Sequence, residues 1–213
     1  MRSALSELPG AADHMRDEAE AAALSSAVGI DCEMVRLRSG RSALARCCIV
    51  AYADKRVLLD SFVHVPPVDV GDYLTQYSGV CAADLCDAPP FDAVRERAVA
   101  LIADNVLVGH GLVNDIKALR LNIPRARMRD TLTLGWEGRR SLKLRDLARD
   151  VLGARVQTAE HSPVEDAVTA VRLHKHHRRQ GGAAAPRLVR VQLCTADAQP
   201  PPLDAPCAVA AAA

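Results

Sequence analysis

Two acidic residues in an apolar segment are the first side chains whose spacing could support chemistry. Asp31 and Glu33 are separated by one residue within the run AVGIDCEMV. If this run is a β-strand, its period of two places both carboxylates on one face. Two such carboxylates repel each other and lose hydration, so a cation that neutralised them would make the arrangement tolerable. A strand that ended at Ile30 would instead leave both acids at a solvated tip, and the pair alone does not decide between the two.

Two further acids and a histidine stand close to the predicted starts of helices. Asp115 follows a short apolar run in GHGLVNDIKAL, and Asp166 lies in EHSPVEDAVTAV. Either acid could simply complement the positive end of a helix dipole. His161 precedes Asp166 by five residues and could act as a general base that activates a water molecule. A single histidine in a loop more often has no such role.

The types of these side chains indicate one kind of chemistry. Carboxylate oxygens without clustered Cys or His ligands favour Mg²⁺ or Mn²⁺ over zinc. Two such ions, about 3.5–4 Å apart, can hold the attacking and leaving oxygens of an in-line displacement at phosphorus. The residues by themselves therefore make hydrolysis of a phosphodiester bond a plausible reaction.

The order of short motifs along the chain resembles a known family. The segment GIDCEMV at 29–35 closely resembles the first motif of the DEDDh superfamily of 3′→5′ exonucleases, in particular the group of RNA exonuclease 4 and the interferon-stimulated exonucleases. His161 and Asp166 have the spacing of the histidine class, and Ser162 stands where the tyrosine class would have Tyr. The remaining matches, in order, are LARC at 44–47, DYLTQYSG at 72–79, VGHGLVNDIKAL at 108–119, RDT at 129–131, SLKL at 141–144 and HSPVEDA at 161–167.

This resemblance, which extends from about Ala27 to Arg179, implies a fold and a set of roles. The implied fold is α/β and RNase H-like, with a five-stranded mixed sheet flanked by helices. Met34 is expected to contact the terminal nucleotide, although core packing is the alternative. His110 is expected near the terminal sugar, although a hydrogen bond that steadies the strand end is the alternative. The residues expected to hold two Mg²⁺ or Mn²⁺ ions are Asp31, Glu33, Asp115 and Asp166, with His161 as the general base.

The sequence departs from the family pattern at two positions. Leu74 stands where relatives often have an arginine that reaches the substrate, so affinity or nucleotide preference is expected to differ. Ile116 stands where relatives often have phenylalanine, and a change in packing is expected there. The four carboxylates and the histidine are all retained, which argues against an inactive member.

The function expected from the resemblance is removal of nucleotides from single-stranded RNA 3′ ends, with release of nucleoside 5′-monophosphates. Ribosomal RNA processing in the nucleus or nucleolus is the expected setting, with the cytoplasm as an alternative. A DNA 3′→5′ exonuclease is the nearest rival. A non-catalytic nucleic-acid-binding module is a third reading, whose mark would be the loss of a ligand or of the histidine.

The elements that must position these residues follow from hydrophobic periodicity and from helix-terminal signals. Three closely spaced strands indicate an antiparallel meander, and alternating helices and strands follow it. The strands are predicted at 27–35, 43–52, 56–65, 106–110 and 128–132, and the helices at 91–103, 113–121, 142–152 and 163–179. Residues 1–26 are predicted to be a leader that is helical from 10 to 26, residues 27–180 the exonuclease domain, and residues 181–213 a low-complexity, mostly disordered tail with a possible short strand at 188–193.

Composition narrows the class of protein. The chain has 213 residues, 49% hydrophobic but only 3% aromatic, so its core must consist of Ala, Val, Leu and Ile. It contains no apolar run that could span a membrane and no secretory signal. The seven cysteines include no C-x-x-C pair, which favours free thiols over disulfides or structural zinc. Residues 117–155 are rich in Arg and Lys, and the run HKHHRR at 174–179 is basic. Either region could contact phosphates or form a solvated face, and the run at 174–179 could also be a weak nuclear signal or complement its helix C-terminus.

Overall fold

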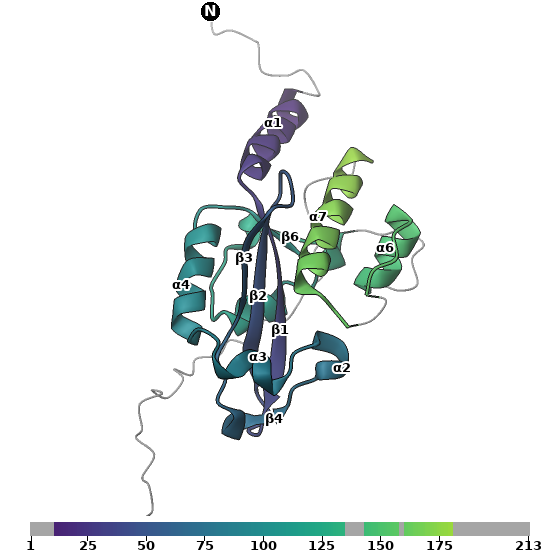
Figure 1. Ribbon diagram of the computed structural model, residues 1–213. Helices are drawn as coiled ribbons and strands as arrows, with labels where there is room; N and C mark the ends of the chain where they lie inside the picture. The colour runs from purple at the N-terminus through teal and green to yellow at the C-terminus, as the bar shows by residue number, and fades with distance from the viewer. Residues whose placement is uncertain (1–10, 135–142, 158–159, 181–213) are drawn as a thin grey trace, which may run out of the picture.

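The computed structural model describes residues 11–134, 143–157 and 160–180, and their side chains from residue 18 onward. These residues form a mixed β-sheet with helices on both faces (Figure 1). Within the described ranges, no helix combines the length and apolar character needed to cross a bilayer. The predicted tail and its possible strand at 188–193 lie outside the described residues.

The first three strands form the predicted antiparallel meander. β1 (Val28–Leu37) pairs with β2 (Ser42–Ala51), and β2 pairs with β3 (Val57–Phe62), both in antiparallel register. β5 (Leu107–Gly109) joins β1 in parallel, and β6 (Met128–Asp130) joins β5 in parallel. The five expected strands therefore follow the order β3-β2-β1-β5-β6, which confirms the RNase H-like mixed sheet.

A short sixth strand and several short helices occur where the sequence pattern is weak. β4 (Val70–Asp72) pairs with the far end of β1, beside a bulge between Arg36 and Leu37. The segment from 69 to 79 contains β4 and the one-turn helix α2 (Thr75–Ser78). The strand predicted to reach Leu132 ends at Asp130, because the Asp130 carboxylate accepts a hydrogen bond from the Leu132 backbone N–H (3.0 Å) and begins a 3₁₀ turn. The remaining short elements are η1 (Pro67–Asp69), α2 (Thr75–Ser78), α3 (Ala82–Cys86), η2 (Arg125–Arg127) and η3 (Thr131–Thr133).

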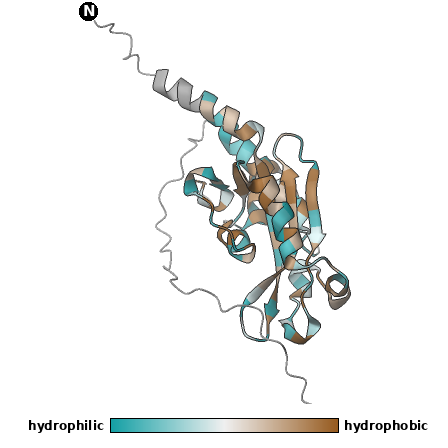
Figure 2. Ribbon diagram, turned by 90° about the vertical axis from the view of Figure 1, so that its left-hand side faces the viewer, coloured by the Kyte–Doolittle hydropathy of each residue, from teal (hydrophilic) through white to brown (hydrophobic). Residues whose placement is uncertain are grey.

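The two faces of the sheet carry separate hydrophobic clusters. On one face, Cys47 and Ile49 pack with α4 (Phe91–Ile102) and with buried leucines around α5 (Val113–Ala118). On the other face, Cys48 and Val50 pack with α7 (Pro163–Arg179). α6 (Leu144–Leu152) lies against α7 rather than against the sheet, through a small leucine cluster. Figure 2 shows strands that are mostly hydrophobic between helices that also carry hydrophilic residues.

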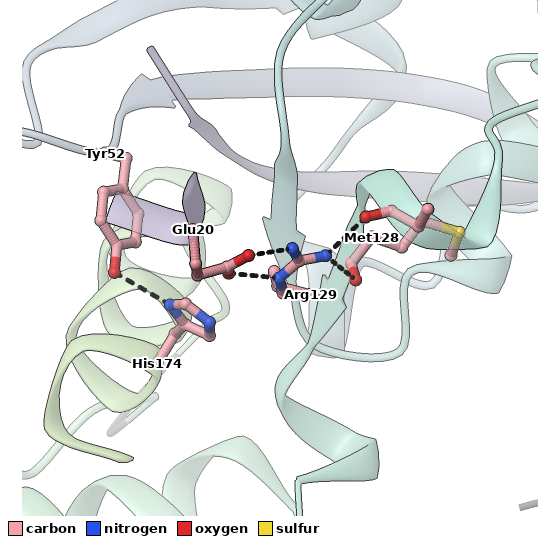
Figure 3. Close-up of polar contacts among 6 residues, drawn as sticks. Glu20, Tyr52, Met128, Arg129 and His174 are labelled. Atoms are coloured by element: carbon pink, nitrogen blue, oxygen red, sulfur yellow. Dashed lines mark hydrogen bonds and ion pairs between the residues drawn. The ribbon is translucent and has the colours of Figure 1, made fainter. Parts of the chain in front are cut away.

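Helix α1 (Ala11–Ser25) is attached to the domain by apolar and ionic contacts. Leu24 is buried in the cluster beneath α7. The Arg129 guanidinium donates two hydrogen bonds to the Glu20 carboxylate, and both side chains are only 11% exposed (Figure 3). Beside this pair, the Tyr52 hydroxyl lies 2.9 Å from Nδ1 of the buried His174 of α7. Residues of the predicted leader thus contribute to the packed structure.

Several arginines of the basic region 117–155 are engaged within the protein. Arg120 lies over the Phe91 ring, 4.5 Å from its centroid. Arg127 donates to the backbone oxygens of Ile102 and Asn105 at the end of α4. Arg149 pairs with acids of its own helix. These contacts favour a structural use of these particular arginines over direct binding of phosphate.

Candidate active site

The first two carboxylates lie in the middle of the sheet. β1 continues to Leu37, so Asp31 and Glu33 are well inside the strand and not at a solvated tip. Both are partly buried, on the same face of β1. The register of β1 against β2 shifts directly after Glu33, at the bulge before Met34. The predicted pairing of the two acids within one strand is therefore confirmed.

Asp115 contacts β1 from the helix that follows β5, the parallel neighbour of β1. β5 ends at Gly109, and a turn leads into α5, whose first turn contains Asp115. The Asp130 carboxylate holds this turn by accepting hydrogen bonds from the backbone N–H groups of Gly111 (2.8 Å) and Leu112 (2.9 Å). The Oδ1 atom of Asp115, whose side chain is buried, accepts a hydrogen bond of 2.9 Å from the Cys32 backbone N–H. Asp115 is thus fixed to the backbone of β1 at Cys32, the residue between Asp31 and Glu33 in the chain.

Asp166 lies in the first turn of α7, and His161 lies in the loop just before this helix. Ser162 caps α7 by accepting a hydrogen bond from the Glu165 backbone N–H, and Pro163 occupies the first turn. Nδ1 of His161 lies 3.7 Å from Oδ2 of Asp166. One ligand atom each from Glu33, His161 and Asp166 lies within 4.8 Å of the other two. Residues from two distant chain segments, β1 and the start of α7, therefore meet at one site.

Gln157 is a further contact to this site that the sequence analysis did not identify. Its side-chain amide donates a hydrogen bond of 2.6 Å to Oδ2 of Asp166, and its backbone N–H donates to Glu165 (3.0 Å). The residue has a positive φ of 53°, a conformation that non-glycine residues adopt rarely. Gln157 is distant from Asp166 along the chain and lies in an irregular turn. No periodic sequence pattern therefore indicates this contact.

Burial and mutual repulsion determine the electrostatics of the cluster. Burial raises the pKa of Asp31 well above its ordinary value, and the charges of Asp115, Asp166 and Glu33 raise it further. Burial raises the pKa of Glu33 to about 7 and that of Asp115 to about 7. It also raises the pKa of Asp166, against the opposing effects of the Gln157 hydrogen bond and of His161. The site therefore disfavours four negative charges unless positive charge enters it.

The residues present fit a divalent metal ion. Oδ1 of Asp166 is buried and, among the described residues, has no hydrogen-bond partner. An unpaired buried carboxylate oxygen of this kind is costly unless it has a ligand. The donors that converge here are carboxylate oxygens with one histidine, which suits Mg²⁺ or Mn²⁺ better than a thiol-binding metal.

The other predicted residues have defined structural surroundings. Met34 packs, partly buried, against the core cluster beneath α4. Nδ1 of His110 lies 2.9 Å from the Thr131 hydroxyl, which itself donates to the Gly109 backbone oxygen (3.0 Å). Both alternatives stated for these residues, core packing and a bond that steadies the strand end, are therefore observed, and their roles toward a nucleotide stay predictions.

The two departures from the family pattern differ in their surroundings. Leu74 precedes α2 with a positive φ of 54°, in the turn that follows β4. Ile116 packs against the main core, as expected for a position that affects packing.

Comparison with known proteins places this geometry in a family. A family profile described as Exonuclease matches residues 28–174, which is more than half of the chain. The chain belongs to the exonuclease family. This match includes all four carboxylates and the histidine, and it confirms the resemblance to the DEDDh group.

Individual relatives of this chain are also named as nucleases. The human apoptosis-enhancing nuclease is 38% identical over 162 residues, which cover 71% of this chain and 49% of the relative. RNA exonuclease 4 of Cryptococcus neoformans is 38% identical over 161 residues, covering 72% of this chain and 38% of the relative. The chain thus spans half or less of these relatives.

A solved structure supports the fold at moderate sequence identity. The RNA exonuclease module of Pan2 from Saccharomyces cerevisiae superposes with a TM-score of 0.66 at 34% identity, covering 74% of this chain and 29% of the Pan2 chain. The same module in complex with AAGGAA RNA matches with the same TM-score.

Proposed function

We propose that this protein is a 3′→5′ exoribonuclease that hydrolyses phosphodiester bonds at RNA 3′ ends and releases nucleoside 5′-monophosphates. The observation that supports it most is the convergence of four carboxylates with raised pKa values beside His161 in a chain of the exonuclease family. RNA is favoured over DNA because relatives are named RNA exonuclease 4 and the Pan2 module is described in complex with RNA.

Four residues would hold two Mg²⁺ or Mn²⁺ ions: Asp31, Glu33, Asp115 and Asp166. Such a pair of ions supplies charge stabilisation and a fixed in-line geometry for displacement at phosphorus. Asp31 and Glu33 are carried on a central strand, and Asp115 is fixed to the backbone between them. The side chains are therefore prepositioned, with little reorganisation required when substrate enters.

His161 would act as the general base. Its position at the loop before α7, 37% exposed and beside Asp166, lets the ring reach both the site and solvent. The backbone N–H of His161 donates to the Tyr77 backbone oxygen (2.8 Å), which fixes the loop without using the ring. The ring can accept a proton from the attacking water and pass it to solvent.

The experiment is a digest of single-stranded RNA and DNA of equal sequence, labelled at either the 5′ or the 3′ end, with Mg²⁺, Mn²⁺ or a chelator. We expect a ladder of shortened 5′-labelled RNA, immediate release of the label from 3′-labelled RNA, no activity with chelator, and slower hydrolysis of DNA. Preference for DNA would instead establish the rival DNA exonuclease. Binding of RNA without any hydrolysis would favour the non-catalytic module.

Matched variants test the assigned roles in the same assay. Asp31→Asn is expected to abolish hydrolysis while the fold persists, and Asp92→Asn, an exposed acid on α4, is the control. His161→Ala is expected to lower turnover by roughly 10²–10⁴-fold, with His176→Ala at the other end of α7 as its control. Activity of Asp31→Asn within about tenfold of the unaltered protein would contradict the assignment of the metal site.

We further propose, from the resemblance to RNA exonuclease 4, that the substrate in the cell is a ribosomal RNA precursor in the nucleus or nucleolus. The cytoplasm is the alternative location. Imaging of the tagged protein, together with the lengths of ribosomal RNA 3′ ends after its depletion, tests this. Unchanged precursor ends would contradict it.

A further inference from the structure

The ion pair between helix α1 and strand β6 buries both of its charges. The Glu20 and Arg129 side chains are each 11% exposed, and Nε of Arg129 donates a hydrogen bond of 2.7 Å to Oε1 of Glu20 (Figure 3). Burial of two charges costs hydration, and apolar side chains in the place of such a pair are often as stable or more stable. The position that this pair fixes therefore explains it better than its contribution to stability.

The same guanidinium also fixes the backbone around β6. Nη1 of Arg129 donates hydrogen bonds to the backbone oxygens of Ala126 (2.8 Å) and Met128 (3.0 Å). β6 has only three residues, and it pairs with β5 alone because it lies at the end of the order β3-β2-β1-β5-β6. A strand with so few backbone partners depends on side-chain contacts for its position, and Arg129 supplies such a contact from α1.

The next residue of β6, Asp130, connects this position to the candidate active site. Its carboxylate accepts hydrogen bonds from the backbone N–H groups of Gly111 (2.8 Å) and Leu112 (2.9 Å), in the turn between β5 and α5. Asp115 stands in the first turn of α5, directly after these two residues. A shift of β6 would therefore move this turn, and with it one of the four carboxylates assigned to the metal ions.

We propose that α1 is a positioning element of the candidate active site, in which Glu20 and Arg129 hold Asp115 in place for metal binding through β6 and Asp130. The inference rests on the proposed function. Helix α1 precedes residues 28–174, which match the exonuclease family, so it lies outside the part of the chain that the family profile covers. Loss of the ion pair loosens the turn between β5 and α5 and weakens metal binding, although no metal ligand is removed.

The test compares Glu20→Ala with two matched variants. Glu96→Ala removes an exposed glutamate from α4, and Leu24→Ala removes a buried apolar contact of α1 but leaves the Glu20 carboxylate. Mn²⁺ binding is measured from the EPR signal of the free ion, at one temperature at which every variant is folded. Glu20→Ala is expected to weaken Mn²⁺ binding by roughly 2- to 30-fold, as for side chains that act on a site through others. The two matched variants are expected to bind Mn²⁺ as the unaltered protein does.

Hydrogen exchange of the metal-free protein tests the connecting contacts themselves. The amides of Gly111 and Leu112 are expected to exchange faster in Glu20→Ala than in Glu96→Ala, because their acceptor on β6 is held less firmly. Glu20→Gln keeps one acceptor for Arg129 and is expected to give intermediate exchange rates and an intermediate Mn²⁺ affinity.

A Mn²⁺ affinity of Glu20→Ala equal to that of Glu96→Ala would overturn the proposal, even if the melting temperature fell. An equal loss of affinity in Leu24→Ala would also overturn it, because the packing of α1 and not the ion pair would then hold the site. In the RNA digest, excess Mn²⁺ is expected to restore the activity of Glu20→Ala. An unaltered protein that hydrolyses no RNA, although Mn²⁺ binding depends on Glu20, would support this inference and count against the proposed function alone.

Discussion

At the scale of single residues, the acidic cluster affects the stability of the fold as well as the proposed chemistry. Asp115 is buried, its pKa is raised by that burial to about 7, and it accepts the Cys32 backbone hydrogen bond. The folded protein therefore holds a proton on this group between about pH 4 and pH 7 that the unfolded chain releases. Its contribution to the free energy of unfolding consequently falls as pH rises through that window.

Asp115→Asn is expected to stabilise the metal-free protein above pH 7, because the amide keeps the acceptor for Cys32 without a charge. The gain should be roughly 1–3 kcal/mol at pH 8 and should nearly vanish at pH 4. Urea denaturation in the presence of a chelator measures it, with the exposed Asp92→Asn as control. A variant that is less stable than the unaltered protein at pH 8 would show that the cluster carries no electrostatic strain.

Gln157 orients Asp166 through its 2.6 Å hydrogen bond, so it is expected to act as a positioning residue. Gln157→Met, which keeps similar bulk but has no amide, should lower the apparent affinity for Mn²⁺ by roughly 10–100-fold. Thermal unfolding at increasing Mn²⁺ concentration measures that affinity directly, and the exposed Asn122→Ala is the control. Equal Mn²⁺ dependence in the two variants would show that Gln157 does not contribute to metal binding.

At the scale of elements, the contact of α7 with α1 and the sheet buries His174. Burial lowers the pKa of His174 to about 4, and Arg129 and Arg178 lower it further against the opposing effect of Glu20. Tyr52 and His177 are the other titratable neighbours. The unfolded chain therefore binds the additional proton between about pH 6.5 and pH 4, and the fold loses stability as pH falls through that window.

His174→Gln, which cannot be protonated in this range, should lose less stability than the unaltered protein between pH 6.5 and pH 4. The expected difference between the two pH profiles is roughly 2–3 kcal/mol at most. Urea denaturation across this range measures it, and comparing the two proteins cancels the titration of shared carboxylates. Parallel profiles would show that His174 takes up its proton as readily in the folded protein as in the unfolded chain.

At the scale of the whole molecule, long periodic segments were predictable and short tertiary ones were not. β1, β2 and α7 were found within a few residues because each has its own apolar face over many positions. β4 has only three residues and α2 only four. β4 is positioned by its pairing with β1, and α2 by its contact with the loop before α7. A sequence pattern does not contain such tertiary contacts.

The site was predictable for a related reason. Asp31, Glu33, Asp115, Asp166 and His161 stand in recognisable sequence motifs, and the parallel pairing of β1 with β5 brings two of these segments close together. The positioning contacts of Gln157 and Asp130 were not assigned, because each depends on a particular turn and on a partner that only the fold brings near. Residue types therefore indicate the proposed chemistry, whereas the fold determines which polar neighbours orient the side chains of the site.

The most direct measurement is the location of Mn²⁺ by anomalous diffraction from crystals soaked with Mn²⁺ and a nucleoside 5′-monophosphate. We expect two manganese peaks about 3.5–4 Å apart among the four carboxylates, with the nucleotide phosphate between the peaks and His161. Manganese bound elsewhere with none among Asp31, Glu33, Asp115 and Asp166 would contradict it.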